Sequence, residues 1–397
     1  MPNTVSWYLC GLAAAIGYVG WGNGMTPVAA LLGLVWAACA SRSIAFAAAA
    51  MYYLAGSRAL PAAADVFFGR ETAMLEGVVL WMGSAVILAA PWGVLHPGRR
   101  GGQAPLRLLI IYAVLLLPPY GLVAWLHPLL GAGQVLPGFG LLSLITGAAL
   151  TAFGAYLAQR FPDRVPAACL VLGVCLALAG AAMSPPATSP LWAGVATADG
   201  REPRGLMEEV VRYSKTEKHV LDALQAKPEA KAVVLPEAYV GTWNLNAKRA
   251  LKSLLDKPLS EREAFALVGT AVPIEGSALA SNSLMIYDGQ VWARYDARFT
   301  VPFGMWHPWT GDGTEPTFAL FGTVQVGQQR ALMSLCFEDL LLGLHLPSLL
   351  LERPDVIVSA ANGWWVRNSS AEVVQREHIE AIARIFDLPL VRAVNRH

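Results

Sequence analysis

Long apolar runs fill the first part of the chain, and shorter apolar runs between charged stretches fill the rest. A helix needs about 20 apolar residues to cross the hydrocarbon core of a bilayer. The first 184 residues therefore predict a transmembrane region of about seven helices. The expected spans are residues 5–22, 25–41, 43–58, 73–95, 106–130, 135–158 and 166–184.

The second part has the pattern of an α/β domain. A proline- and serine-rich linker is expected at residues 185–194, and the domain itself at residues 195–397. Amphipathic periodicity predicts helices, and short apolar runs predict strands, one pair of which forms a hairpin turning at Asp288-Gly289. The expected helices are 205–224 and 371–386, and the expected strands lie within 191–198, 231–236, 264–272, 281–299, 329–336, 354–362 and 388–394.

Composition supports this division. The 397 residues are 55% hydrophobic and only 14% charged, whereas soluble domains carry about 25% charged residues. No lysine occurs before Lys215, so the charge is concentrated in the second part. A net charge of +1 without a basic stripe excludes nucleic acid as the main partner.

The arginines indicate the orientation in the membrane. Cytoplasmic loops are enriched in lysine and arginine, which places the N-terminus inside and the C-terminal domain in the periplasm of a bacterial inner membrane. The first segment lacks a basic leader and a cleavage site, so we expect a retained anchor. The arginines assigned to the cytoplasmic side are Arg42, Arg99, Arg100, Arg107, Arg160 and Arg164, against Arg58 and Arg70 on the other side.

Three polar residues follow buried runs of the second part. Glu237 follows "VVLP", Cys336 follows "ALMSL" and Asn362 follows "VIVSAA". Functional side chains often lie just past strand ends, so the three could share one sheet edge. Each also has a plain alternative: a solvated loop acid, a core thiol and a turn residue, respectively. No metal-ligand cluster and no phosphate loop is visible, so no cofactor is expected.

The motifs "VVLPEAYV", "SNSLMIYDGQVWARYDARFTVPFG", "SLCFEDL" and "VIVSAANGWW" resemble, in order, those of the nitrilase (carbon–nitrogen hydrolase) superfamily. With the membrane part and "VPFG", the whole chain resembles apolipoprotein N-acyltransferases, and most of all conjugal-transfer proteins of the TraB type. The resemblance implies an αββα sandwich after a multi-pass helical membrane region.

The resemblance also implies a Glu-Lys-Cys triad. Glu237 would be the general base and Cys336 the nucleophile that holds an acyl group as a thioester. Glu338 matches a second acid two residues past the nucleophile. A lysine would stabilise the oxyanion together with the backbone N–H after the cysteine.

The sequence departs from this pattern in three places. The lysine position, four residues before "VPFG", is Ala297, and its neighbour Arg298 is the candidate substitute. Adjacent strand residues point to opposite faces, so Arg298 would need a bulge to turn inward. The glutamate expected after "VPFG" is Met305, and the chain stops at His397, where the acyltransferases continue.

The leading hypothesis is a membrane acyltransferase that moves an acyl group from a phospholipid through Cys336 to an amine of an exported protein, in conjugation or in the envelope. Asn362, Trp364 and Trp365 would form a substrate-binding lid, the alternative for the tryptophans being core packing. A second hypothesis is a protein that has the nitrilase fold but is catalytically impaired, and that serves as a scaffold in a conjugation or envelope complex. A third is hydrolysis of an amide by the same thioester route.

Overall fold

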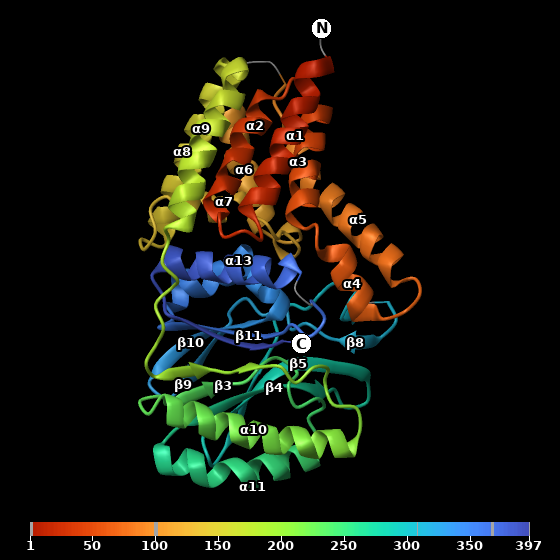
Figure 1. Cartoon of the computed structure of the whole chain (residues 1–397), viewed down its shortest axis with the longest axis vertical. Coiled ribbons are helices and arrows are strands. Elements are labelled where there is room, and N and C mark those ends of the chain that lie inside the picture. Colours follow the sequence, from red (N-terminus) through yellow and green to blue (C-terminus); the bar gives the residue numbers. More distant parts are fainter. Residues whose placement is uncertain (1–2, 99–101, 308, 367–368, 397) are drawn as a thin grey trace. The chain divides into compact units, whose positions relative to one another are not determined.

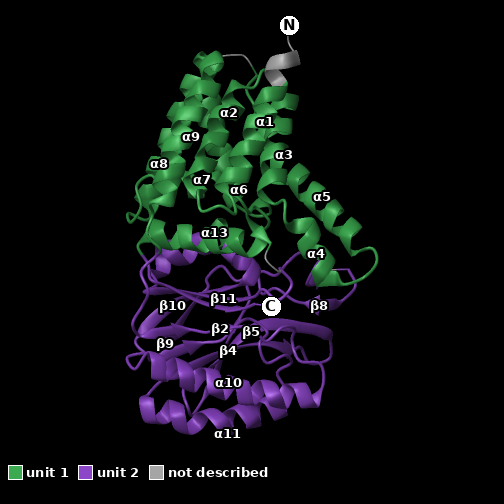
Figure 2. Cartoon of the chain, in the orientation of Figure 1, with its two compact units in different colours: residues 1–185, 340–344, 368–387 green, residues 186–339, 345–367, 388–397 purple. Residues whose placement is uncertain are grey.

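The computed structural model describes residues 3–98, 102–307, 309–366 and 369–396. The chain divides into two compact units, coloured separately in Figure 2. Unit 1 comprises residues 1–185, 340–344 and 368–387, and unit 2 comprises residues 186–339, 345–367 and 388–397. Arg99 and Arg100, which the orientation argument used, lie outside the described residues.

Unit 1 is helical, and Figure 1 shows its helices drawn mostly side by side. The helices are α1 (Asn3–Gly20), η1 (Thr26–Leu31), α2 (Leu32–Ala38), α3 (Arg42–Gly56), α4 (Leu60–Phe68), α5 (Ala73–Val94), α6 (Ala104–Leu116), η2 (Tyr120–Leu122), α7 (Pro128–Gly133), α8 (Leu141–Arg160), η3 (Pro162–Arg164), α9 (Val165–Ala181) and α13 (Ser370–Phe386).

Three helical segments of the described chain are long and apolar enough to cross a membrane: Ala73–Val94, Leu141–Arg160 and Pro162–Ala181. Much of their surface carries exposed apolar side chains such as Leu75, Phe153 and Leu170. These segments coincide with three of the seven expected spans. The total number of spans stays a prediction.

Other expected spans are shorter or broken in the structure. The expected span 25–41 is divided into η1 and α2, with a proline near the start of η1. The expected span 106–130 ends as α6 at Leu116, before Pro118 and Pro119, and resumes as the short α7. Proline removes a backbone donor and clashes with the preceding turn, which explains the end of α6 before Pro118, whereas η1 passes directly into α2.

Helix α13 belongs to unit 1 by its contacts, although it lies far along the chain. The carboxylate of Glu377 accepts hydrogen bonds from the backbone N–H groups of Gly22, at 2.6 Å, and Gly24. The ring of His378 stacks on Trp21 with centroids 4.2 Å apart. The amphipathic pattern predicted the helix, but only the tertiary structure shows that its buried face meets the N-terminal segment of the chain.

Unit 2 contains two β-sheets and the helices that pack on them. Its strands are β1 (Trp192–Gly194), β2 (Ala196–Thr197), β3 (Ala232–Val234), β4 (Phe265–Pro273), β5 (Ala278–Tyr287), β6 (Trp292–Asp296), β7 (Trp306–His307), β8 (Asp312–Thr314), β9 (Thr323–Val326), β10 (Gln329–Leu335), β11 (Val356–Asn362) and β12 (Leu390–Asn395). The helical segments are α10 (Leu206–Ala226), α11 (Leu245–Arg262), η4 (Cys336–Leu340), α12 (Leu342–Pro347) and η5 (Ser348–Glu352), of which residues 340–344 belong to unit 1.

The first sheet has seven strands in the order β1-β3-β4-β5-β8-β7, with β6 paired to β5. The second has five strands in the order β2-β12-β11-β10-β9. Strands β10, β11, β12 and β2 run parallel, as do β1, β3 and β4. Parallel neighbours bring their carboxyl ends to the same edge of a sheet, which is where functional residues gather.

Alternating side chains of each strand build two apolar layers. In β3 and β4, Val233, Ala266 and Val268 pack with residues of α10 and α11, which cover the outer face of the first sheet. Val234 and Leu267 face the other way, into a core shared with β10, β11 and β12. The two sheets therefore pack face to face, as the period of two along the strands requires.

The sequence placed most elements of unit 2 correctly. The hairpin at Asp288-Gly289 is confirmed as β5 and β6, which pair antiparallel. The expected strand 191–198 is instead two short strands, β1 and β2, that belong to different sheets. The sequence pattern could not show this, because both halves are equally apolar and only their partners differ.

Candidate active site

Three of the residues singled out by sequence come together at strand ends of unit 2. Glu237 follows β3 by three residues, Cys336 directly follows β10, and Asn362 is the last residue of β11. All three are buried, with exposed fractions of 3%, 8% and 5%. The first comes from one sheet and the other two from the second, so the group lies where the two sheets meet.

Glu237 is held by three donors. Its Oε1 accepts a hydrogen bond of 2.6 Å from Nδ2 of Asn282, and its Oε2 accepts one of 3.1 Å from the backbone N–H of Asn362. The thiol of Cys336 also hydrogen-bonds to this carboxyl group. The acid is therefore oriented from both sheets, with the sulfur within reach of a proton transfer.

Burial controls the titration of this pair. Desolvation raises the pKa of Glu237 to about 7, against the opposing effect of its hydrogen bonds from Cys336, Asn282 and Asn362. Desolvation also raises the pKa of Cys336 well above its usual range, and the nearby charge of Glu237 raises it further. In the resting site the thiol is therefore protonated.

The backbone is strained at both reactive positions. Cys336 has a φ of +48°, and Ala238, next to Glu237, has a φ of +49°. Left-handed conformations are unfavourable for residues other than glycine, and such strain clusters at functional sites. The turn at Cys336 ends β10 and starts η4, which directs the sulfur toward Glu237.

A frame of amides surrounds the acid. Nδ2 of Asn362 donates to Glu202 at 2.7 Å, and its Oδ1 accepts from Nδ2 of Asn395 at 2.9 Å. Asn395 ends β12 and also accepts from Oγ1 of Thr197 at 2.8 Å. The carboxyl ends of β2, β11 and β12 are thus tied together directly behind Glu237.

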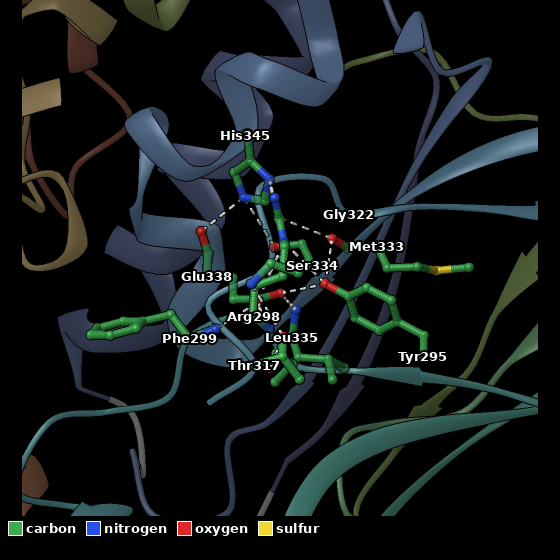
Figure 3. A network of polar contacts seen from close by, with 12 residues as sticks. Tyr295, Arg298, Phe299, Thr317, Gly322, Met333, Ser334, Leu335, Glu338 and His345 are labelled. Atoms are coloured by element: carbon green, nitrogen blue, oxygen red, sulfur yellow. Dashed lines mark hydrogen bonds and ion pairs between the residues drawn. The ribbon is translucent and has the colours of Figure 1, made fainter. Parts of the chain in front are cut away.

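Arg298, the candidate substitute for the lysine, belongs to a separate buried network, which Figure 3 shows. Its Nε lies 3.7 Å from Oε1 of Glu338 and donates to the hydroxyl of Tyr295 at 3.2 Å. Its Nη2 lies 3.0 Å from Nδ1 of His345, whose Nε2 lies 2.8 Å from the carbonyl oxygen of Glu338. The guanidinium is buried inside unit 2, and these contacts direct it toward Glu338.

His345 completes that network as a neutral ring. Burial and the adjacent guanidinium lower its pKa to about 3. With Nδ1 accepting from Arg298, Nε2 carries the proton that is donated to the Glu338 carbonyl. The sequence around His345 did not indicate its contacts with Arg298 and Glu338, because His345 lies seven residues past Glu338 in an apolar helix.

Glu338 acts as a clamp between two segments of the site. Its Oε1 accepts from the backbone N–H of Arg298 at 2.6 Å, and of Phe299 at 3.1 Å. Its Oε2 accepts from the backbone N–H of Leu335 at 2.9 Å. One carboxylate therefore joins the segment after β6 to the residue before Cys336.

Ala297 is 1% exposed and packs in the apolar core between the sheets. Its backbone N–H donates to the carbonyl of Asn282 at 2.7 Å. The position expected to hold a lysine thus adjoins the residue whose amide reaches Glu237. Met305, the second departure, lies in a turn whose N–H donates to Val301 at 2.9 Å.

Of the expected lid residues, Asn362 is buried, and Trp364 and Trp365 are half-buried. The indole N–H of Trp365 donates to the carbonyl of Asn362 at 2.8 Å. The ring of Trp364 lies 4.4 Å from the guanidinium carbon of Arg201. The lid segment expected from the sequence is "NGWWVRNSS", and its residues 367 and 368 lie outside the described residues.

Asn282, Asn395 and Glu202 were not expected from the sequence. Asn282 stands inside β5 between Ser281 and Ser283, and a polar residue within a buried strand was the available signal. Asn395 and Glu202 gave no signal, since polar residues at strand ends and in loops are common. Among the described residues, no group of three His, Cys, Asp or Glu residues could hold a metal ion.

The chain is similar to two conjugal transfer proteins. It is 30% identical to "Conjugal transfer protein TraB" of Agrobacterium fabrum, over 97% of this chain and 91% of that one. It is also 30% identical to a probable conjugal transfer protein TraB of Sinorhizobium fredii, over 96% and 95% of the two chains. These likenesses confirm the TraB-type resemblance. No family model matches the chain.

Solved structures of the nitrilase superfamily also align with it. A variant of an amidase from Nesterenkonia is 12% identical, with a TM-score of 0.38, over 54% of this chain and 81% of that one. A carbon–nitrogen hydrolase from Helicobacter pylori is 11% identical, with a TM-score of 0.37, over 51% and 72%.

Proposed function

Because the chain belongs to the TraB family of conjugal transfer proteins, we propose that it is a membrane-bound, cysteine-dependent N-acyltransferase. It would move an acyl group from a phospholipid through a thioester on Cys336 to an amine of an exported protein. The observation that carries this proposal is the buried hydrogen-bonded pair of Glu237 and Cys336 at a strained strand end.

In the first half-reaction, Glu237 takes the thiol proton as the sulfur of Cys336 bonds to the ester carbonyl carbon of the lipid. The carbon–oxygen bond to the lysolipid then breaks, and the leaving oxygen takes the proton from Glu237. A pKa near 7 suits an acid that must accept and return a proton at neutral pH. In this proposal the backbone N–H after Cys336, within η4, stabilises the oxyanion.

In the second half-reaction, the amine attacks the thioester carbonyl and the carbon–sulfur bond breaks. Glu237 takes the proton of the amine and returns it to the sulfur, so the enzyme is regenerated. The same carboxyl group therefore serves both steps, which requires the acceptor to approach on the side of Glu237.

Aromatic side chains beside Cys336 support a lipid as the donor. The ring of Phe337 lies 6.2 Å from Phe299, whose ring lies 5.7 Å from Phe318. This series of rings ends at Phe318, one of several exposed apolar side chains in this part of unit 2, and exposed apolar side chains can bind lipid. The exposed residues are Phe303, Trp309, Phe318, Leu320 and Phe321.

The membrane placement proposed here is multi-pass in the bacterial inner membrane, with the catalytic domain in the periplasm. The three long apolar helices support the presence of spans. A protein embedded in this way has phospholipid at hand as donor, and exported proteins pass the same face as acceptors.

Ala297 favours a second candidate, a nitrilase-type scaffold without chemistry in a conjugation or envelope complex. Alanine at the expected lysine position cannot supply the cation that would stabilise a thiolate, and the pKa of Cys336 is raised. Amide hydrolysis, the third hypothesis, would use the same thioester with water as acceptor.

The test is to trap the acyl-enzyme. The full-length protein in detergent is incubated with phospholipid, and intact mass spectrometry measures an acyl adduct. The proposal expects an adduct that is lost in Cys336→Ser and kept in the control Cys175→Ser, an exposed cysteine of α9. No adduct on the wild-type protein, with Cys336→Ser fully active in conjugation, would favour the scaffold. Rapid loss of the adduct to water without amine would favour the hydrolase.

A further inference from the structure

A cavity of about 490 Å³ lies in unit 2, between the loop after β2 and the first half of α10. Its walls include basic and acidic side chains, together with Met207 and Val211. The basic residues are Arg201, Arg204, Arg212 and Lys215, and the acidic residues are Asp199, Glu202 and Glu208.

Arg212 lines this cavity as a buried guanidinium with an unused donor. The residue is only 7% exposed, and its Nη2 donates to the carbonyl oxygens of Asp199 and Arg201 at 3.0 and 2.9 Å. Its Nη1 has no hydrogen-bond partner in the described chain. Such a group is costly to leave unpaired, and a bound anion would satisfy it.

Two further arginines at the cavity are not paired with acids. Within the described parts of the chain, the guanidinium groups of Arg201 and Arg204 form no ion pair, whereas Lys215 is paired with Asp199. Both arginines are exposed, and the ring of Trp364 supports Arg201. Guanidinium groups bind carboxylates in a planar, two-pronged geometry, so three of them around one cavity favour an oxyanion ligand.

The cavity is connected to the proposed active site through Glu202. This residue lines the cavity and accepts the hydrogen bond from Asn362, whose backbone N–H donates to Glu237. The loop is further fixed by Asn395, which accepts from the N–H of Asp199 at 3.0 Å. The cavity therefore adjoins the side of the general base, whereas the aromatic rings approach Cys336 through Phe337.

We infer that this cavity, lined by Arg201, Arg204 and Arg212, binds an acidic segment of the acceptor polypeptide near the amine that is acylated. The inference rests on the proposed function, in which the base must take a proton from the acceptor. The lining also includes Met207 and Val211, but four of its side chains are cationic, which favours an anionic ligand. Carboxylate side chains match both the unused donor of Arg212 and the two unpaired arginines.

The experiment measures binding without turnover. Full-length protein in detergent is titrated into a fluorescently labelled, glutamate-rich peptide, and anisotropy reports the Kd. The matched peptide has glutamine in place of each glutamate. We expect the acidic peptide to bind more tightly, and the double variant Arg201→Gln/Arg204→Gln to weaken it by about tenfold. Arg249→Gln, an exposed arginine of α11 away from the cavity, serves as the matched control and should bind like the wild type.

Three other outcomes overturn the inference. Equal binding of the two peptides, or equal binding by the double variant, excludes an acidic-peptide site. If glycerophosphate displaces the labelled peptide more readily than the unlabelled glutamate-rich peptide does, the cavity is assigned to a lipid head group instead. Because both arginines are exposed, their loss should leave folding intact, which thermal unfolding verifies.

Acidic-peptide binding that persists while no acyl adduct ever forms on Cys336 would refute the acyltransferase and leave the binding site standing.

Discussion

Nε of Arg298 lies 3.7 Å from a carboxylate oxygen of Glu338, and both side chains are completely buried. A buried ion pair of this kind contributes little net stability when intact, but loss of one partner leaves a charge without compensation. Here the acid also fixes the segments on both sides of Cys336, so the guanidinium supports the geometry of the site through Glu338.

Replacement of Arg298 by methionine should destabilise the protein by about 3–5 kcal/mol, because the carboxylate of Glu338 loses its counter-charge. Glu338→Gln alone should also be destabilising, whereas the double variant should lose less than the sum of the two. Thermal unfolding of the purified protein gives all three values. Additive effects would show that the two side chains are energetically independent.

A lysine introduced at Ala297 should increase the rate of acyl-adduct formation by about ten- to a hundredfold. The ammonium would favour the ionised forms of Glu237 and Cys336 and would stabilise the oxyanion. Overpacking of this buried position should cost about 1–3 kcal/mol of stability. Mass spectrometry at fixed times measures the rate, with Ala293→Lys, an exposed position of β6, as control. Equal rates in both variants would show that charge at this position is unimportant.

The stability of the wild-type protein should fall as the pH rises from about 4.5 to 7, relative to Glu237→Gln. The folded-state pKa of this acid is about 7 and its ordinary value is 4.5, so in this window the folded state binds more protons than the unfolded state. The contribution is fully present below pH 4.5 and is lost above 7, with a total of about 3 kcal/mol.

Unfolding temperatures of both proteins at pH 5 and pH 8 test this sign. The difference between the variant and the wild type should shift in favour of the variant at pH 8. A constant difference across the range would mean that the carboxyl group titrates normally.

Gly269→Ala should misplace Glu237 and abolish adduct formation. A Cβ atom at this position of β4 would lie 2.0 Å from the carbonyl oxygen of Pro236 and 2.7 Å from Cα of Glu237. Backbone atoms cannot yield at such distances, so the loop after β3 must move. Adduct formation and thermal unfolding measure the effect, with Gly83→Ala, where no atom lies within 4 Å, as control. Wild-type activity of Gly269→Ala would show that the position of the loop is not critical.

The sequence by itself indicated most strands and helix α10 of unit 2, and the order of its candidate site residues along the chain. Periods of two and 3.6 predicted β4, β5, β10, β11, α10 and α13, because these patterns report which face of an element is buried. Glu237, Cys336 and Asn362 were found because each follows a buried run, and parallel strands bring such ends together.

Tertiary structure decided the partners of those residues. Asn282 donates to Glu237 from 45 residues away, and Glu202 accepts from Asn362, 160 residues away, and nothing local indicates such contacts. The direction of Arg298 toward Glu338 also depends on which side chains fill the space around it. A local pattern shows that a side chain is buried, but the identity of its neighbours follows from the packing of strands that are distant in the chain.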